Sequence, residues 1–176
     1  MSLPKIYLFL LLSGLAFQAC AQPTTTTPTT TTEKPKTVAY ASAKAGWLVD
    51  LDEAYNLSTK SGKPILANFT GSDWCGWCKK LDADVFSKPE FKEWAQKNVV
   101  LLELDFPRFK QIPQKNQSQN AAMQQALQIR GYPTVYVINL NKNPSTGQYN
   151  IDALGSTGYT QTVQQFIATI DGFLKS

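Results

Sequence analysis

The order of apolar patterns along the chain predicts an α/β fold with a mixed sheet at its centre. Segments with helical spacing of apolar residues alternate with short apolar runs typical of buried strands, in the order helix, strand, helix, strand, helix, strand, strand, helix. A turn-rich segment joins the last two strands, which indicates an antiparallel hairpin. At 176 residues, the chain has room for one compact domain of about 100 to 150 residues plus appendages.

The first helix and the first strand lead into a turn. Apolar residues recur at helical spacing over residues 47–55, and Gly62 is expected to end this helix. Residues 65–70 form a short apolar run that is typical of a buried strand. The strand continues into residues 71–73, Gly-Ser-Asp, a turn that contains capping residues. A second helix is therefore expected to begin at or just before Cys75.

The middle of the chain is expected to add a helix, a strand and a polar loop. Residues 87–90, Ser-Lys-Pro-Glu, have the capping-box spacing of a helix start, and the apolar run over residues 99–105 is typical of a buried strand. From Phe106 to Gln119 the chain turns polar, with two prolines and several glutamines. We expect this segment to be a loop larger than the fold requires.

The last third of the chain is expected to contain a helix, a hairpin and a final helix. Apolar residues from Ala122 to Ile129 predict a helix that ends at Gly131 and is followed by a strand over residues 135–138. The turn-rich residues 141–147 join that strand to another at residues 149–154. The final helix has an apolar face made of Val163, Phe166, Ile167, Ile170 and Phe173.

Composition excludes several classes of function. The formal net charge of +4 is mild and the lysines are scattered, so we predict no nucleic-acid partner. The chain has no histidine, which excludes Ser-His and Cys-His catalysis and every histidine-ligated metal site. Its three cysteines cannot make a multi-disulfide scaffold, so the fold must depend on its apolar core.

Residues 1–20 are expected to be an export signal. Lys5 supplies the positive charge, and the apolar run over residues 6–17 is too short to span a bilayer comfortably. Two ways of processing the signal remain open. In the first, the small residues Ala19 and Ala21 around Cys20 direct cleavage after Ala21, and a soluble chain is secreted.

The second way keeps Cys20 as the first residue of the mature chain. Residues 17–20, Phe-Gln-Ala-Cys, resemble a bacterial lipobox, in which a small residue precedes the cysteine that becomes lipidated. Phe17 and Gln18 depart from the usual leucine and small residue of that motif. This alternative predicts a lipid anchor on Cys20.

Residues 21–44 are expected to be a linker rich in threonine and proline. A segment with almost no apolar residues cannot bury a core and stays extended. We interpret it as an inert spacer, with O-glycosylation as the alternative. The compact domain is then expected over residues 45–176.

Cys75 and Cys78 form a CxxC pair where a strand is predicted to pass into a helix. Unpaired amides and the dipole at a helix N-terminus stabilise an anion, which favours a thiolate at Cys75. A free cysteine titrates near 8.5, whereas comparable CxxC positions fall to between roughly 3.5 and 7.5. Cys78, one helical turn later, can reach back to form a disulfide. Cys75 is therefore expected to attack a partner disulfide and Cys78 to resolve the mixed disulfide.

Two structural alternatives to a redox pair are disfavoured. A zinc site needs four ligands, and the chain offers no histidine and no second CxxC, so we predict no metal. A purely structural disulfide between Cys75 and Cys78 would close a very short loop and stabilise little.

Three stretches resemble thioredoxin, in the same order and with similar spacing. They are residues 63–69 (KPILANF), 74–80 (WCGWCKK) and 129–134 (IRGYPT). The likeness covers roughly residues 45 to 176 and implies a thioredoxin fold, a mixed central sheet flanked by helices. The Gly-Ser-Asp-Trp sequence at residues 71–74 looks like that of exported bacterial thioredoxin-like proteins. The residues Gly-Tyr-Pro-Thr at 131–134 are also similar to those of protein disulfide isomerases.

The resemblance also implies roles for the residues around the pair. Pro133 would be a cis-proline beside the cysteines, and Tyr132 would offer its backbone to an extended substrate. Trp74 is expected to be partly core and partly a substrate platform. Gly76 permits close approach of a partner, and Trp77 must lie on the surface or cover Cys78.

Two positions depart from the thioredoxin pattern. Thioredoxin has a buried acid on its first core strand to move the proton of the resolving cysteine, where this chain has Asn68. Either water or another carboxylate, such as Glu103, takes that part, or proton transfer from Cys78 is slower. Trp77 replaces a proline, which leaves the redox potential open between reductant and oxidant. Asp73, just before the pair, is expected to cap the helix rather than to act as an acid.

These features predict a thiol:disulfide oxidoreductase that acts on exported proteins and needs no cofactor besides the Cys75–Cys78 disulfide. Its expected partners are protein thiols and disulfides and a membrane electron donor. An oxidase or isomerase that uses the same cysteines is one alternative. A binding module that holds a partner protein or a Cu(I) ion is another.

Overall fold

The structure, a computed structural model, describes residues 40–175. The elements follow the predicted order, except that three helical segments, one of them the π-helical η1, lie between the first two strands. The elements are α1 (Leu51–Ser61), β1 (Ile65–Thr70), α2 (Gly76–Leu81), η1 (Asp82–Phe86), α3 (Pro89–Asn98), β2 (Val100–Asp105), α4 (Gln114–Ala126), β3 (Thr134–Lys142), β4 (Tyr149–Thr157) and α5 (Val163–Leu174).

The four strands form one mixed sheet in the order β2-β1-β3-β4. β1 pairs with β2 in parallel, whereas β1 with β3 and β3 with β4 are antiparallel. The register places Asn68 of β1 opposite Glu103 of β2, and Phe69 opposite Thr134 of β3. The end of β1 therefore lies beside the start of β3, which brings the loops at those positions to the same edge of the sheet.

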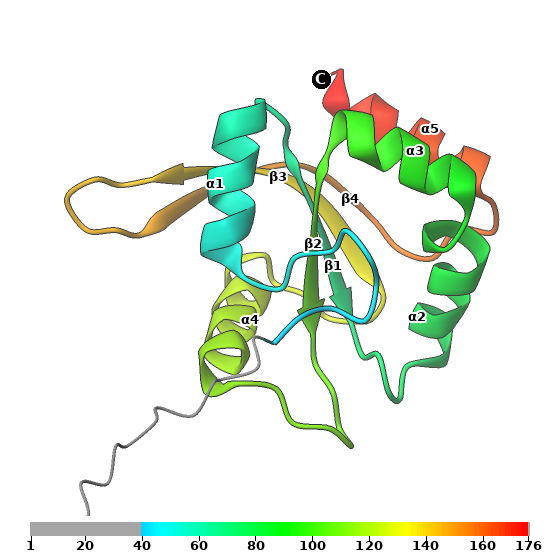
Figure 1. Cartoon of the computed structure of the whole chain (residues 1–176), viewed down its shortest axis with the longest axis horizontal. Coiled ribbons are helices and arrows are strands. Elements are labelled where there is room, and N and C mark those ends of the chain that lie inside the picture. Colours follow the sequence, from blue (N-terminus) through cyan, green and yellow to red (C-terminus); the bar gives the residue numbers. More distant parts are fainter. Residues whose placement is uncertain (1–39, 176) are drawn as a thin grey trace, which may run out of the picture. The chain divides into compact units, whose positions relative to one another are not determined.

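Helices cover both faces of the sheet (Figure 1). On one face, α2, η1, α3 and α5 pack over alternate strand residues such as Leu66 and Val135. On the other face, α1 and α4 pack over the residues in between, such as Ala67 and Leu102. Because successive strand residues point to opposite faces, Asn68 lies on the same face as Leu66, under α2 and η1. This arrangement confirms the predicted α/β sandwich with a mixed sheet.

The predicted polar loop over residues 106–119 is too long, because its last six residues belong to α4. The inward side of α4 carries amides along its first half and the apolar Met123 only near its end. The amide groups of Asn116 and Gln119 donate hydrogen bonds to the Val49 carbonyl at 2.9 and 3.0 Å, and that of Asn120 donates to the Asp105 carbonyl at 2.9 Å. A search for apolar periodicity cannot find a helix that docks through polar side chains.

Two helix starts also differ from the predictions. α1 begins at Leu51 with Asp50 as its N-cap, and the preceding Leu48 forms a bridge with Leu102 of β2. The predicted capping box at residues 87–90 is wrong. Ser87 ends η1 and donates to the Ala83 carbonyl, and α3 begins at Pro89 without a side-chain cap.

The described residues begin within the predicted linker, and its last residues contact the domain. The Ser42 hydroxyl donates to Glu103 of β2 at 3.0 Å, and the Lys44 ammonium forms an ion pair with the same carboxylate. The predicted export signal, Cys20 and the rest of the linker lie outside the described residues. None of the helices between residues 40 and 175 is long and apolar enough to cross a membrane.

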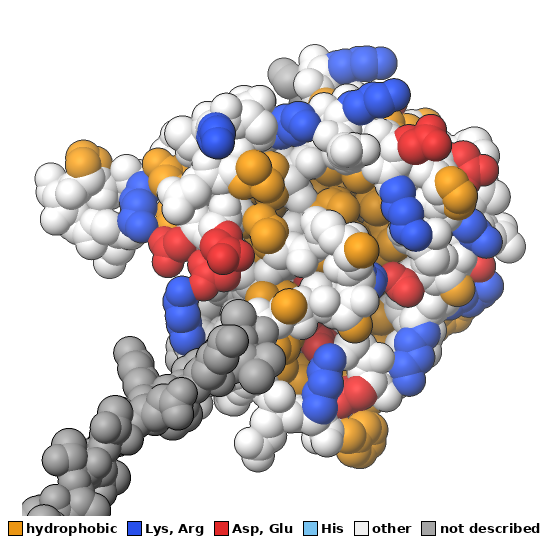
Figure 2. All heavy atoms as spheres, viewed as in Figure 1, with side chains coloured by type: hydrophobic (Ala, Val, Ile, Leu, Met, Phe, Trp, Pro, Cys, Tyr) orange, Lys and Arg blue, Asp and Glu red, His pale blue; other side chains and the backbone are white. Residues whose placement is uncertain are grey.

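Charged side chains are spread over the face seen in Figure 2, where lysines and arginines are interspersed with acidic groups.

Within the described part of the chain, no group of three or more cysteine, aspartate and glutamate side chains could hold a metal ion.

Candidate active site

Cys75 and Cys78 lie at the junction of β1 and α2, joined as a disulfide with their Cα atoms 5.2 Å apart. Cys75 is the N-cap residue of α2, with extended backbone, and its sulfur accepts a hydrogen bond from the Cys78 amide at 3.2 Å. A helix N-terminus leaves such amides without partners inside the helix. The local structure therefore directs a donor and the positive end of a helix dipole at the Cys75 sulfur.

Exposure does not distinguish the two cysteines, because their exposed fractions are 5% for Cys75 and 6% for Cys78. Position does distinguish them. Cys75 precedes the helix and receives the amide hydrogen bond, whereas Cys78 lies within the first turn of α2.

Trp74 is held on three sides. Its indole N–H donates to the Phe106 carbonyl at 2.8 Å, and its ring meets the Tyr132 ring edge-on with 5.8 Å between centroids. The Arg108 guanidinium lies 3.8 Å from the centroid of the same ring. Behind the ring, Gly71 leaves room that a Cβ atom would fill, because that atom would collide with the indole. Trp74 is thus a half-buried side chain, fixed by its neighbours, directly before Cys75 in the chain.

The loop before β3 reaches the site through Tyr132. The Tyr132–Pro133 peptide bond is cis, as the thioredoxin resemblance implies. The Tyr132 hydroxyl accepts a hydrogen bond from the Gln124 amide at 2.7 Å, and burial raises the pKa of this phenol. Through its ring contact with Trp74, Tyr132 lies beside the residue that precedes Cys75.

Gly76 and Trp77 form the outer surface of the CxxC turn. Both are exposed, and the Trp77 side chain is 60% exposed, so it lies on the surface as one of the two predicted positions allows. Its ring contacts that of Tyr159 with 5.1 Å between centroids, and the Tyr159 hydroxyl donates to Asp84 at 2.7 Å.

Asp73 does not cap α2, contrary to the sequence prediction. Its carboxylate accepts hydrogen bonds from the backbone amides of Arg108, Phe109 and Lys110, at 3.0, 2.8 and 3.1 Å. Partial desolvation raises the pKa of Asp73, but these hydrogen bonds outweigh it and leave the pKa below its ordinary value. Cys75 takes the N-cap position instead.

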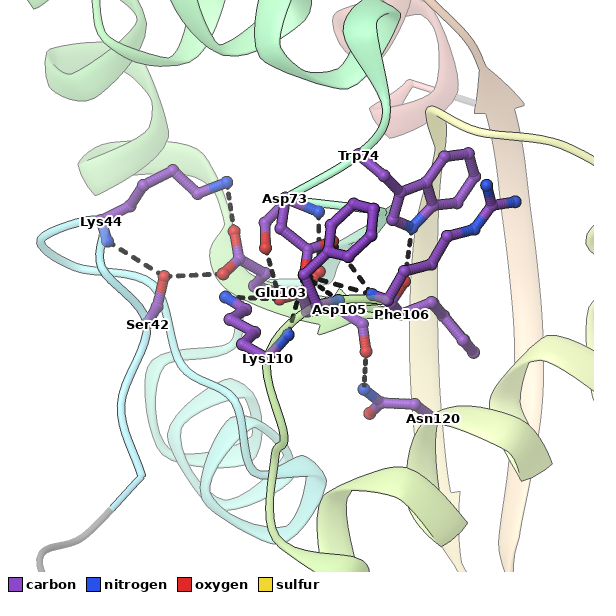
Figure 3. A network of polar contacts seen from close by, with 12 residues as sticks. Ser42, Lys44, Asp73, Trp74, Glu103, Asp105, Phe106, Lys110 and Asn120 are labelled. Carbon is purple, nitrogen blue, oxygen red and sulfur yellow. Dashed lines mark hydrogen bonds and ion pairs between the residues drawn. The ribbon is translucent and has the colours of Figure 1, made fainter.

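A second carboxylate joins the same two loops (Figure 3). Asp105, at the end of β2, accepts hydrogen bonds from the Ser72 amide at 2.9 Å and from the Ser72 hydroxyl at 2.7 Å. It also forms an ion pair with Lys110 at 2.9 Å. The segment that follows β2 is therefore fixed to the turn that precedes Cys75.

Polar and charged groups lie on the sheet face that α2 and η1 cover. Asn68 and Glu103 are neighbours there on β1 and β2, both buried. The Lys44 ammonium forms an ion pair with Glu103 and lies 3.7 Å from an oxygen of Asp82. Asp82 follows Cys78 by four residues, so both side chains lie on one side of the helical segment. Two carboxylates, those of Glu103 and Asp82, thus share one ammonium partner, Lys44, and Glu103 is the β2 neighbour of Asn68.

Sequence patterns do not identify several of these groups. Arg108 and Phe109 fall in the predicted polar loop, and Lys44 falls in the predicted linker. The sequence signal for this loop is the pair of Arg108 and Phe109, together with two prolines, shortly after an apolar strand. No pattern in the sequence links Lys44 to Glu103, because 59 positions separate them.

Comparisons with known proteins agree with this architecture. The disulfide bond reductase DsbH of Chlamydia pneumoniae is 33% identical over 87 residues, which cover 49% of this chain and 52% of the relative. The thiol:disulfide interchange protein DsbD of Klebsiella pneumoniae is 33% identical over 92 residues, 52% of this chain and 14% of the relative. The match with the first of these spans about half of the relative's length.

Solved structures extend the likeness to most of the domain. A structure described as DsbH oxidoreductase matches with a TM-score of 0.62 and 25% identity, and covers 81% of this chain and 90% of that chain. A thioredoxin from Thermus thermophilus matches with a TM-score of 0.51 at 14% identity over 72% of this chain and 84% of that chain, a likeness of fold alone. A family model described as thioredoxin-like matches residues 46–139, more than half of the chain. The chain is therefore a member of the thioredoxin-like family.

Proposed function

We propose that the protein is a thiol:disulfide oxidoreductase that reduces or exchanges the disulfides of exported proteins through Cys75 and Cys78. The observation that carries this proposal is the Cys75 sulfur at the N-cap of α2, 3.2 Å from the Cys78 amide. The names of the relatives, a disulfide bond reductase and a thiol:disulfide interchange protein, support the same class of reaction.

The reaction begins from the reduced pair. The Cys75 thiolate attacks one sulfur of a partner disulfide, so a Cys75–partner bond forms while the partner's own S–S bond breaks and its second sulfur leaves as a thiolate. The Cys78 thiolate then attacks the Cys75 sulfur and releases the partner's first sulfur. The partner gains two electrons and, once its thiolates take up protons, ends as a dithiol, while the protein ends as the disulfide seen here.

The roles of the two cysteines follow from the helix start. The Cys78 amide and the helix dipole favour negative charge on the Cys75 sulfur, because both present partial positive charge to it. Cys78 lies within the first turn of α2, where its sulfur bonds to that of Cys75. We therefore assign the attack to Cys75 and the resolution to Cys78.

Proton transfer from Cys78 needs a group that Asn68 cannot supply. Asp82 lies one turn after Cys78, and among residues 40–175 its carboxylate has a single ionic partner, Lys44, at 3.7 Å. Glu103 is buried and already bound by Lys44 and Ser42. We assign Asp82 as the proton acceptor. Glu103 and Lys44 are assigned a positioning role, because they set the charges around Asp82.

Partner binding is assigned to the surface around the pair. Exposed Gly76 and Trp77 follow Cys75, and Trp74 precedes it. The Trp74 ring contacts that of Tyr132, which is followed by the cis-proline Pro133. An extended partner segment can lie across Gly76, where no side chain hinders approach, with its backbone along the loop at Tyr132.

The test is turnover of the disulfides of insulin, with dithiothreitol as the electron source. The protein should raise the rate well above that of dithiothreitol alone, and Cys75→Ser should abolish the gain. A protein that binds insulin without any gain in rate would be a binding module, and the proposed enzyme function would be wrong. The equilibrium potential with glutathione then gives the direction, since thioredoxin lies near −270 mV and the oxidant DsbA at about −120 mV.

We propose further that the chain is exported and anchored to a membrane through a lipidated Cys20. The lipobox-like residues before Cys20 and the Thr/Pro-rich residues after it support this. Such a tether would hold the domain near a membrane electron donor, which an exported reductase needs to regenerate its dithiol. Mass spectrometry of the mature N-terminus decides: lipidated Cys20 is expected, and an unmodified Gln22 would mean a soluble exported protein.

A further inference from the structure

Phe109 presents the most exposed large hydrophobic side chain between residues 40 and 175. Its exposed fraction is 82%, compared with 60% for Trp77 and 46% for Leu57. Single exposed hydrophobic residues are common and need no explanation by themselves. The surroundings of Phe109, however, are unusual in three respects.

The first is that the backbone carrying Phe109 is fixed. We call residues 106–110 the Phe109 loop. Asp73 accepts three backbone hydrogen bonds from this loop, including the Phe109 amide at 2.8 Å, and Asp105 forms an ion pair with Lys110 at 2.9 Å (Figure 3). An aromatic ring on a fixed backbone loses little conformational entropy when a partner covers it, so it is suited to be an anchor for binding.

The second is that the Arg108 side chain has no carboxylate partner among residues 40–175. The Arg108 guanidinium lies 3.8 Å from the centroid of the Trp74 ring, and no acidic side chain among residues 40–175 forms an ion pair with it. The nearby Asp73 is instead occupied by backbone amides. A guanidinium that lies over an aromatic ring still has N–H donors available for a carboxylate of a partner.

The third is the position of the Phe109 loop beside the cysteine pair. The Phe106 carbonyl accepts the Trp74 indole N–H, and the Phe106 ring lies 5.3 Å from that of Tyr132. Trp74 precedes Cys75 directly. A partner whose cysteine meets Cys75 therefore has neighbouring residues within reach of the loop.

We propose that the Phe109 loop is a docking element that selects partners by the residues next to their cysteine. An apolar side chain of the partner packs on Phe109, and a carboxylate of the partner pairs with Arg108. The proposal rests on the proposed function insofar as the partner is a protein whose disulfide the pair reduces. The binding itself requires no redox step.

The experiment measures binding without redox chemistry. Two short peptides carry serine in place of the reactive cysteine, one with leucine and glutamate within two residues of it and the other with glycine and serine there. We expect the leucine-glutamate peptide to bind roughly tenfold more tightly in a calorimetric titration, the effect of one well-placed anchor. Phe109→Ser should bring the two affinities to within about twofold, and Arg108→Gln should weaken the binding of the leucine-glutamate peptide while leaving that of the glycine-serine peptide unchanged.

Leu57→Ser is the matched control. Leu57 is also an exposed apolar residue, but it lines a cavity of about 660 Å³ together with Lys63 and Val99. Lys63 and Val99 precede β1 and β2, whereas the site lies at the opposite ends of these strands. This variant should keep the full preference. Equal binding of both peptides to the unaltered protein, or a preference that survives Phe109→Ser, would overturn the proposal. Because the peptides cannot exchange disulfides, a protein that shows the preference but reduces no insulin would contradict the proposed function and leave the docking element standing.

Discussion

Asp73 and Phe109 are joined across 36 positions of sequence by a hydrogen bond of 2.8 Å from the Phe109 amide to the Asp73 carboxylate. Asp73 lies two residues before Cys75, so this bond connects the turn before the cysteine pair to the Phe109 loop. Neighbouring amides of Arg108 and Lys110 donate to the same carboxylate. The three donors surround one charge, as in other anion-binding loops of the backbone.

The first prediction concerns the titration of Asp73. Its pKa lies below the ordinary value of 3.8, because amide donors favour the charged carboxylate. The stabilisation from this carboxylate is therefore fully present above pH 3.8 and is lost as the pH falls through the lower, folded-state pKa. Amide chemical shifts of Phe109 and Lys110 should follow this titration in NMR spectra, with a midpoint below 3.8. Asp73→Asn should remove the step, and a midpoint at or above 3.8 would contradict the assignment.

The second prediction concerns Gly71. A methyl group there would collide with the Trp74 indole, so Gly71→Ala should displace the ring and lower the free energy of unfolding by about 1 to 3 kcal/mol. The control is Gly172, which is exposed in α5 with open space around a new Cβ atom. Gly172→Ala should raise the free energy of unfolding by about 0.5 to 1 kcal/mol, because alanine favours the helix. Denaturant titration measures both, and an unchanged stability for Gly71→Ala would show that Trp74 is not held as described.

The third prediction compares the roles of the Asp82 and Glu103 carboxylates in proton transfer. Asp82→Asn should slow the release of the partner from the mixed disulfide, by roughly 10²-fold for the loss of a positioned proton acceptor, and should leave the first attack nearly unaffected. Glu103→Gln should have a smaller effect on release, since Lys44 and Ser42 already bind that carboxylate. Rapid quenching and mass spectrometry give the lifetime of the mixed disulfide. The opposite ranking of the two variants would transfer the role to Glu103.

The architecture and the cysteine pair were predictable because their signals are local. The apolar run of β1, the turn after it and the CxxC spacing lie within residues 65–78, and each residue type has a direct physical meaning there. The start of α4 was not predictable in this way, because Asn116 and Asn120 are inward-facing amides that bind backbone carbonyls. Their partners, Val49 and Asp105, are known only once the fold is formed.

The surroundings of the pair were harder to predict for a related reason. Asp73 has the sequence context of a helix cap, and only the tertiary structure brings the amides of residues 108–110 to it. Lys44 lies in a segment whose composition resembles a linker, yet it pairs with Glu103 on the sheet. In both cases a charged group is bound by residues far away in sequence, and neither periodicity nor spacing carries that information.

The most direct test of the redox assignment is to trap the mixed disulfide. Cys78→Ser protein, mixed with insulin, should accumulate a covalent adduct whose partner is attached to Cys75, because the attacking sulfur remains and the resolving sulfur is gone. Cys75→Ser protein should accumulate none. Mass spectrometry of the digested adduct identifies the attached cysteine: a bond to Cys75 alone is the predicted result, and adducts on Cys78, or none with either variant, would contradict the account.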